Sequence, residues 1–174
     1  MMRRAVLSLV LTVGLLVAGA GAQAGAASTR AEYVAQVDPI CQAFRGPASS
    51  ADSAYIKNYK RLFRVARKGT VKAFVRQTNR TAGSLLRFTQ IHMSVTDQIA
   101  TVPAAAADAG TVNTWLNYRR QSDAFSTSAA SALKQFKFKR FFKQNDHAGA
   151  AEAAGRETIA PFGFQVCGVP GVYM

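Results

Sequence analysis

The chain has 174 residues and a formal net charge of +13 at pH 7, which results from 22 basic and nine acidic side chains. This length is enough for one domain with a hydrophobic core. Two distant cysteines and two isolated histidines lack the ligand spacing of a metal site, and neither a glycine-rich phosphate loop nor a nucleophile elbow is present. The sequence therefore predicts no metal, no cofactor and no catalytic residue.

The chain begins with the pattern of an export signal. Residues 1–4 form a short segment made basic by Arg3 and Arg4, residues 5–20 are apolar except for Ser8 and Thr12, and overlapping A-x-A cleavage patterns span 22–26. We expect residues 1–26 to be a cleaved signal peptide; removal of its two arginines leaves 20 basic and nine acidic residues, a net charge of +11. An uncleaved N-terminal anchor is the alternative, although a membrane span needs about 20 apolar residues. The mature domain, 27–174, is predicted to be secreted or associated with the cell envelope.

Cys41 and Cys167 lie 126 positions apart. Two cysteines in an exported chain usually pair, so we predict a disulfide between them. Two free, buried thiols are the alternative. In the chain-entropy model, a loop of this length stabilises a fold by about 5 kcal/mol.

Apolar residues recur at helical spacing nearly throughout the mature chain. Residues 29–32 form a capping box that starts a first helix, which Gly46-Pro47 is predicted to end. Pro39 either kinks this helix or follows Asp38 as the cap of a second start. A second helix is predicted from 49–52 to a C-terminal cap at Gly69.

Thr70 is the predicted N-cap of a third helix that runs towards Val102. Its predicted buried stripe consists of Val71, Phe74, Val75, Thr78, Ala82, Leu85, Thr89 and Met93. A fourth helix is expected from Thr111 to Phe142, and a short fifth helix from 145 or 146 to Pro161, with an irregular tail from about 162. No strand pattern is present. We predict an all-α bundle of four to five helices whose ends are tied by one disulfide.

The segments EYVAQVDPICQAF and FGFQVCG lie near the two ends of the mature chain. They resemble the N-terminal helix cysteine motif and the C-terminal (Tyr/Phe)-Gly-x-x-x-Cys-Gly motif of a group of small secreted proteins and lipoproteins from actinobacteria. The resemblance covers only these ends. It implies an exported helical fold with a Cys41–Cys167 bridge, and it implies no activity. Pro39, the strong basicity and the lack of a lipid-anchoring cysteine depart from the group.

Charge is distributed unevenly along the chain. No acidic residue lies between Asp52 and Asp97, and that interval holds ten basic residues: Lys57, Lys60, Arg61, Arg64, Arg67, Lys68, Lys72, Arg76, Arg80 and Arg87. At about 100° per residue they lie opposite the apolar stripes, so simple solvation of two amphipathic helices is one interpretation. Binding to an anionic surface is the other, because no interspersed glutamate relieves the repulsion between like charges at i,i+4.

A second patch alternates cations with aromatic rings. It consists of Lys134, Phe136, Lys137, Phe138, Lys139, Arg140, Phe141, Phe142 and Lys143. One helix face cannot bury all four phenylalanines, so we expect a bend here or exposed rings. Such surfaces suit membrane interfaces or single-stranded nucleic acid, and export argues against nucleic acid. Ordinary packing of the rings against the next helix and the tail is the alternative.

The sequence thus predicts an exported, non-catalytic cell-envelope protein whose basic helix faces bind an anionic partner: phospholipid, a wall polymer or an acidic protein. The alternative is a small-molecule carrier with its ligand between the helices near Trp115, Tyr118 and the phenylalanines. An enzyme of unrecognised type is a third hypothesis. His92, beside the apolar stripe, is expected to be partly buried and hydrogen-bonded, and His147 is expected at the surface. No oligomeric state follows from the sequence.

Overall fold

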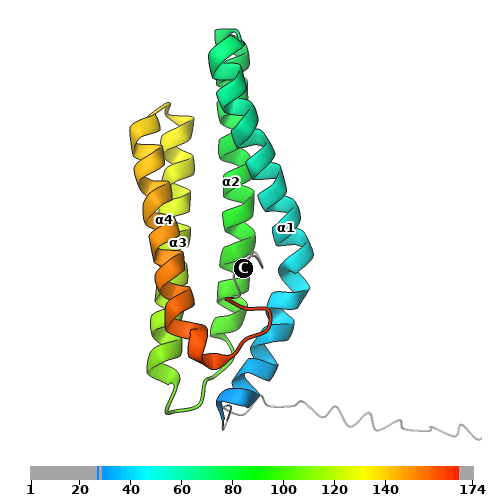
Figure 1. The fold of residues 1–174 in the computed structure, drawn as a ribbon, viewed down its shortest axis with the longest axis vertical. Helices are drawn as coiled ribbons and strands as arrows, with labels where there is room; N and C mark the ends of the chain where they lie inside the picture. The colour runs from blue at the N-terminus through cyan, green and yellow to red at the C-terminus, as the bar shows by residue number, and fades with distance from the viewer. Residues whose placement is uncertain (1–26, 28, 169–174) are drawn as a thin grey trace, which may run out of the picture.

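A computed structural model describes residues 27 and 29–168, so the predicted signal peptide lies outside the described residues. The fold consists of helices α1 (Arg30–Lys68), α2 (Val71–Ala100), α3 (Ala109–Lys134) and α4 (Phe138–Ile159), followed by a 3-10 turn, η1 (Ala160–Phe162) (Figure 1). The described part contains no strand. The all-α prediction is confirmed, with four long helices.

Helix α1 is continuous, so the predicted break at Gly46-Pro47 is wrong. Both Pro39 and Pro47 lie inside the helix. Its buried residues are Tyr33, Val37, Cys41, Ala48, Ala51, Tyr55 and Leu62. This stripe keeps steps of three, four or seven residues through both prolines, so burial of one continuous face outweighs the backbone hydrogen bonds that proline removes.

The turn between α1 and α2 forms where the sequence predicts it. Gly69 is the C-cap of α1, and the Thr70 hydroxyl accepts a hydrogen bond from the Ala73 N–H as the N-cap of α2. A Cβ atom at Gly69 would lie 2.6 Å from the Val65 carbonyl oxygen. This close approach explains the glycine, although its φ of −93° is open to any residue.

The predicted buried stripe of α2 is right in its middle and wrong at its ends. Thr78, Ala82, Leu85 and Thr89 are buried, whereas Val71, Val75 and Met93 are exposed. Val71 lies in the first turn of α2, before Phe74, the residue of α2 whose ring contacts Phe136 and Phe138 at the turn between α3 and α4. The buried face instead continues through Val95 and Ile99.

The predicted helix boundaries near the phenylalanines are wrong. Helix α3 ends at Lys134 rather than Phe142, and α4 begins at Phe138 rather than at 145 or 146. Phe136 occupies the turn with a φ of 58°. Phe136 in this turn is exposed, whereas Phe141 in the first turn of α4 is buried.

The four helices form an incompletely closed bundle. Helix α1 packs against α2, α2 against α3, and α3 against α4, but no Cα atom of α1 lies within 8 Å of one of α4. The segment after η1 crosses from α4 to α1 at one end of this side (Figure 1). The α1–α4 side is therefore spanned by the chain at one end and by side chains elsewhere.

The C-terminal segment 163–168 is fixed to α1 by covalent and polar contacts. The predicted Cys41–Cys167 disulfide is present, with Cα atoms 5.6 Å apart. The Asp38 carboxylate does not cap a helix start. It lies inside α1 and accepts hydrogen bonds from the backbone N–H groups of 165, 166 and 167 at 2.8, 3.1 and 3.0 Å. Anchoring by a carboxylate supplies partners for three otherwise unpaired donors.

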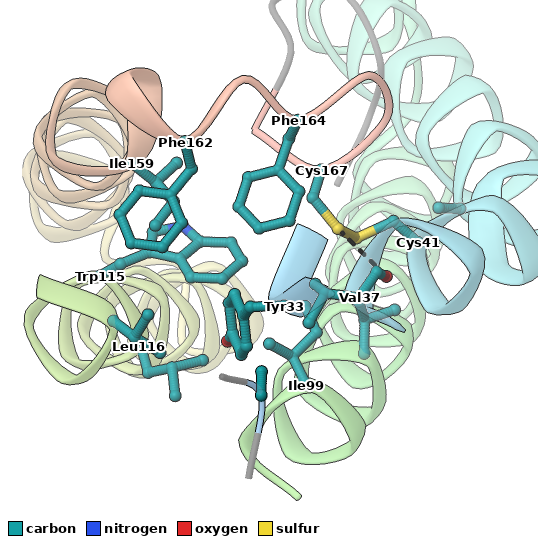
Figure 2. Close-up of a cluster of buried hydrophobic side chains, with 14 residues drawn as sticks. Tyr33, Val37, Cys41, Ile99, Trp115, Leu116, Ile159, Phe162, Phe164 and Cys167 are labelled. Atoms are coloured by element: carbon teal, nitrogen blue, oxygen red, sulfur yellow. Dashed lines mark hydrogen bonds between the residues drawn. A yellow bond between two sulfur atoms is a disulfide. The ribbon is translucent and has the colours of Figure 1, made fainter. Parts of the chain in front are cut away.

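Aromatic packing completes this end of the bundle. Phe162 and Phe164 stack with ring centroids 6.0 Å apart, and both meet the edge of the Tyr33 ring (Figure 2). The ring centroids of Trp115 and Phe164 are 5.5 Å apart. The ring of Trp115 also packs on Gly155, where an added Cβ atom would lie 3.3 Å from the Cβ of Tyr118, a tight contact. This core is separate from a second one that contains Leu85, Leu133 and Phe141 near the other end.

Candidate functional site

The two basic segments predicted from the sequence meet at one end of the bundle. The helices are antiparallel, so the α1–α2 turn and the α3–α4 turn lie at the same end (Figure 1). Contacts between aromatic rings join the two segments. The ring centroid of Phe74 lies 6.3 Å from that of Phe136 and 5.7 Å from that of Phe138, and the centroids of Phe63 and Phe142 are 6.5 Å apart. We call this region, residues 57–87 with 134–143, the basic end.

The basic end carries uncompensated positive charge. The ten predicted cations of α1 and α2 are all exposed, as are the five cations of 134–143. No acidic residue lies between Asp52 and Asp97 or between Asp123 and Asp146. Within the described part of the chain, none of these fifteen side chains forms an ion pair. Their repulsion is therefore relieved by solvent and counter-ions alone.

Exposed apolar side chains gather at the same end. Val71 is 80% exposed, Phe63 and Phe136 are 42% exposed, and Phe142 is 39% exposed. Val75 belongs to the same group. Among the described residues, only Ile56 and Met93 are comparably exposed large apolar side chains elsewhere. The alternative, that these rings pack against the next helix and the tail, is wrong in its partners: Phe141 is buried against Tyr59 of α1, and the half-buried Phe138 contacts Phe74 of α2.

An apolar cavity of about 260 Å³ lies beneath these rings. Its lining is contributed by α1, α2 and α4: Tyr59, Leu62, Phe63, Ala66, Phe74, Phe138, Phe141 and Phe142. The rings of Tyr59 and Phe63 are nearly perpendicular with their centroids 4.9 Å apart, and the centroids of Tyr59 and Phe141 are 6.1 Å apart. The end of the molecule thus combines a positively charged rim with an aromatic hollow.

The hairpin of α1 and α2 projects beyond the α3–α4 turn (Figure 1). Because Phe63 and Phe74 contact that turn, the segment between them forms the projecting tip. Four of the predicted cations, Arg64, Arg67, Lys68 and Lys72, lie in this tip. They can approach a flat surface before the rest of the molecule does.

A polar layer lies at the middle of the bundle, between the two apolar cores. His92 Nδ1 lies 2.7 Å from Asp123 Oδ1, and Arg119 Nε donates to the Thr96 hydroxyl at 2.9 Å. Burial lowers the pKa of His92, the nearby Arg119 charge lowers it further, and the Asp123 carboxylate opposes both. We therefore assign a neutral imidazole whose Nδ1–H donates to the Asp123 carboxylate.

His92 is hydrogen-bonded as expected and more deeply buried than the expected partly buried histidine, and His147 is exposed as expected. No pattern in the sequence indicated that Asp123 is the partner of His92. His92 and Asp123 are 31 positions apart on different helices, and no local pattern links them.

Arg119 is the other charged group of the polar layer. Burial lowers the pKa of Arg119 to about 10, so its guanidinium stays charged at neutral pH.

A second cavity, of about 250 Å³, lies against this layer on the α1–α4 side. All four helices contribute to it, including Asp52 and Tyr55 from α1, His92 from α2, Asp123 from α3 and Glu152 from α4. Trp115 and Tyr118, where the sequence placed a carrier's ligand, do not line it. Trp115 is instead part of the core beside the disulfide.

Among the described residues, no group of three or more histidine, cysteine, aspartate and glutamate side chains is arranged to hold a metal ion. Likewise, none of the helices in the described part is sufficiently long and apolar to cross a membrane. No protein-family model, curated protein or solved structure matches the chain.

Proposed function

We propose that this chain is an exported, non-catalytic protein of the cell envelope that binds anionic phospholipid surfaces through its basic end. The observation that carries the proposal is the gathering of fifteen unpaired cations over the half of the described bundle next to the α1–α2 and α3–α4 turns, with five exposed apolar side chains among them. Cations attract the anionic headgroups, and apolar rings enter the boundary between headgroups and acyl chains.

Phospholipid is favoured over the other anionic partners by the exposed rings. A wall polymer or an acidic protein would be attracted by the same charge, but a phosphate-rich polymer offers no apolar phase to Phe63, Val71, Phe136 or Phe142. Aromatic side chains with one apolar side and adjacent cations suit a membrane interface. The projecting tip places Arg67, Lys68 and Val71 where a surface is met first.

Each cation close to an anionic membrane contributes about 1 kcal/mol, and its effect fades beyond a Debye length of about 10 Å at 0.1 M salt. Replacing Arg61, Arg64, Lys68 and Lys72 together by glutamine is therefore expected to weaken binding by up to about a thousandfold. All four side chains are exposed, so the helical circular dichroism should not change.

The test measures sedimentation with vesicles of phosphatidylglycerol, with phosphatidylcholine vesicles as the uncharged control, at about 0.05 M and 0.5 M salt. The matched control replaces Arg45 and Arg120, exposed cations outside the basic end, by glutamine. We expect the control variant to bind nearly as well as the parent. If the quadruple variant binds the vesicles as well as the parent does at low salt, the basic faces are only solvated helix surfaces and the proposal is overturned.

A second variant separates lipid from other anionic partners. Replacing Phe136 and Phe142 by serine leaves every cation in place, so the electrostatic encounter should persist while the salt-resistant fraction of vesicle binding falls. If this variant keeps its salt-resistant binding, or if the parent binds wall polymer and ignores phosphatidylglycerol vesicles, the phospholipid assignment is wrong.

Export itself is supported by the signal pattern at the start of the chain and by the disulfide, since disulfides persist in oxidising compartments. N-terminal sequencing of the protein from the culture medium or envelope tests it. We expect the mature chain to begin after Ala24 or Ala26. A membrane-retained product that begins at Met1 or Met2 would contradict cleavage.

A further inference from the structure

The 250 Å³ cavity on the α1–α4 side concentrates negative charge in a strongly basic protein. Three of the nine acidic residues, Asp52, Asp123 and Glu152, line it. They come from three different helices, so the bundle brings them together although no sequence pattern does. Asp52 forms no ion pair with a described residue. Burial raises the pKa of Asp52, and the charge of Glu152 raises it further. The carboxylates of Asp52 and Glu152 therefore repel each other across this side of the bundle.

Two arginines limit this excess of negative charge without cancelling it. The Arg119 guanidinium is buried near Asp123 and stays charged, and Arg156 pairs with Glu152 one turn away on α4. Three carboxylates against two guanidinium groups leave one negative charge at the cavity, and Arg119 does not line the cavity itself. A positively charged occupant is therefore favoured over an anion.

His92 supplies an independent polar contact. It is 9% exposed and lines the cavity. Its Nδ1–H is committed to Asp123, which leaves Nε2 as an unprotonated acceptor. Nε2 forms no hydrogen bond with a described residue and is solvent-accessible, and because His92 lines the cavity, an occupant can approach this nitrogen. A nearly buried acceptor of this kind calls for a donor from an occupant.

We propose that this cavity binds a small organic amine, as a protonated primary or secondary ammonium. The ammonium N–H groups would donate to His92 Nε2 and lie between the carboxylates of Asp52 and Glu152. The rings of Tyr55 and Phe88, which also line the cavity, would contact the cation or its carbon skeleton. The volume suits a molecule smaller than a typical drug, since drug-sized pockets have about 300–1,000 Å³. This proposal is independent of lipid binding at the basic end.

The test follows the imidazole nitrogens of the purified protein by NMR while ethanolamine, putrescine and tyramine are added. The chain has two histidines, so His147, exposed on α4 and outside the cavity, is an internal control. We expect at least one of the amines to shift His92 Nε2 and leave His147 unchanged. The absence of any His92 shift at about 10 mM of all three amines, which corresponds to a free energy weaker than roughly −3 kcal/mol, would overturn the proposal.

Matched ligands and variants test the recognition chemistry, shown here for tyramine. The neutral analogue 4-ethylphenol lacks the ammonium group, and N,N,N-trimethyltyramine lacks its N–H donors; each is expected to bind at least about tenfold more weakly. Asp52→Asn and Glu152→Gln should each weaken tyramine binding by about tenfold. Glu157→Gln removes an equal charge from an exposed position of α4 outside the cavity and should leave binding unchanged.

If Asp52→Asn and Glu152→Gln bind tyramine as tightly as Glu157→Gln does, the carboxylates do not recognise the ligand and the proposal fails. The same conclusion follows if 4-ethylphenol shifts His92 at the same concentrations as tyramine. Both substituted carboxylates are partly exposed, so the variants are expected to fold, and their amide spectra should match that of the parent.

Discussion

The Cys41–Cys167 disulfide should account for a large share of the stability of this bundle. Both cysteines are buried, and the loop they close spans 126 positions, nearly all of the described chain. The chain-entropy model assigns about 5 kcal/mol to a loop of this length, because the cross-link restricts the unfolded ensemble. The total stability of a domain is typically about 5–15 kcal/mol, so the double substitution Cys41→Ala/Cys167→Ala should remove a third of it or more.

Urea unfolding followed by circular dichroism measures this change as a shift of the midpoint with little change in the native spectrum. The alanine substitutions also delete two buried sulfur atoms, so the reduced parent protein is the matched reference for the loss of the covalent bond. We expect both forms to be destabilised. A loss below about 1 kcal/mol in the reduced parent would show that the loop-entropy argument does not apply to this chain.

Four further substitutions test the structure at single residues. Asp38→Ala removes the acceptor of three backbone N–H groups and should lower the free energy of unfolding by about 2–3 kcal/mol, measured by urea unfolding of the oxidised protein; no change would mean that 163–168 is not held by this carboxylate. Because burial lowers the pKa of His92 below its ordinary 6.5, the unfolded state binds the proton more readily, so stability should be complete above pH 6.5 and fall as the pH decreases below it. His92→Gln should flatten this part of a stability–pH profile, and an equally steep fall in the variant would assign the effect elsewhere. Gly69→Ala should cost about 1–3 kcal/mol because its Cβ would strike the Val65 carbonyl, whereas Gly83→Ala, in open space within α2, should gain about 0.5–1 kcal/mol; equal effects of the two substitutions on thermal unfolding would contradict this distinction.

Helix boundaries show what local patterns can predict. The capping box at Thr29 and the turn at Gly69 and Thr70 were predicted correctly, since each depends on groups within four residues of one another. The break at Pro47 and the continuous helix through Phe136 were predicted wrongly. In both cases burial of a helix face against another helix decided the outcome, and local propensity is a weak guide where tertiary contacts compete with it.

The candidate sites show the same division. The ten cations of α1 and α2 were identified from their spacing, and each is exposed as the opposite-face argument requires. Their meeting with the 134–143 segment could not be predicted, because it depends on which ends of the antiparallel helices coincide. The cavity on the α1–α4 side, which we propose binds an amine, corresponds to no pattern in the sequence, because Asp52, His92 and Glu152 lie on three different helices.

By itself, the sequence determined the helical class, the positions of the capping signals, the pairing of Cys41 with Cys167 and the excess of positive charge. Each of these follows from composition or from interactions over a few positions along the chain. Only the tertiary structure decided that Asp38 holds the C-terminal segment and that His92 pairs with Asp123, across separations of 127–129 and 31 residues. Such contacts depend on the rotation and register of packed helices, which are set by the whole buried surface at once and leave no local pattern in the sequence.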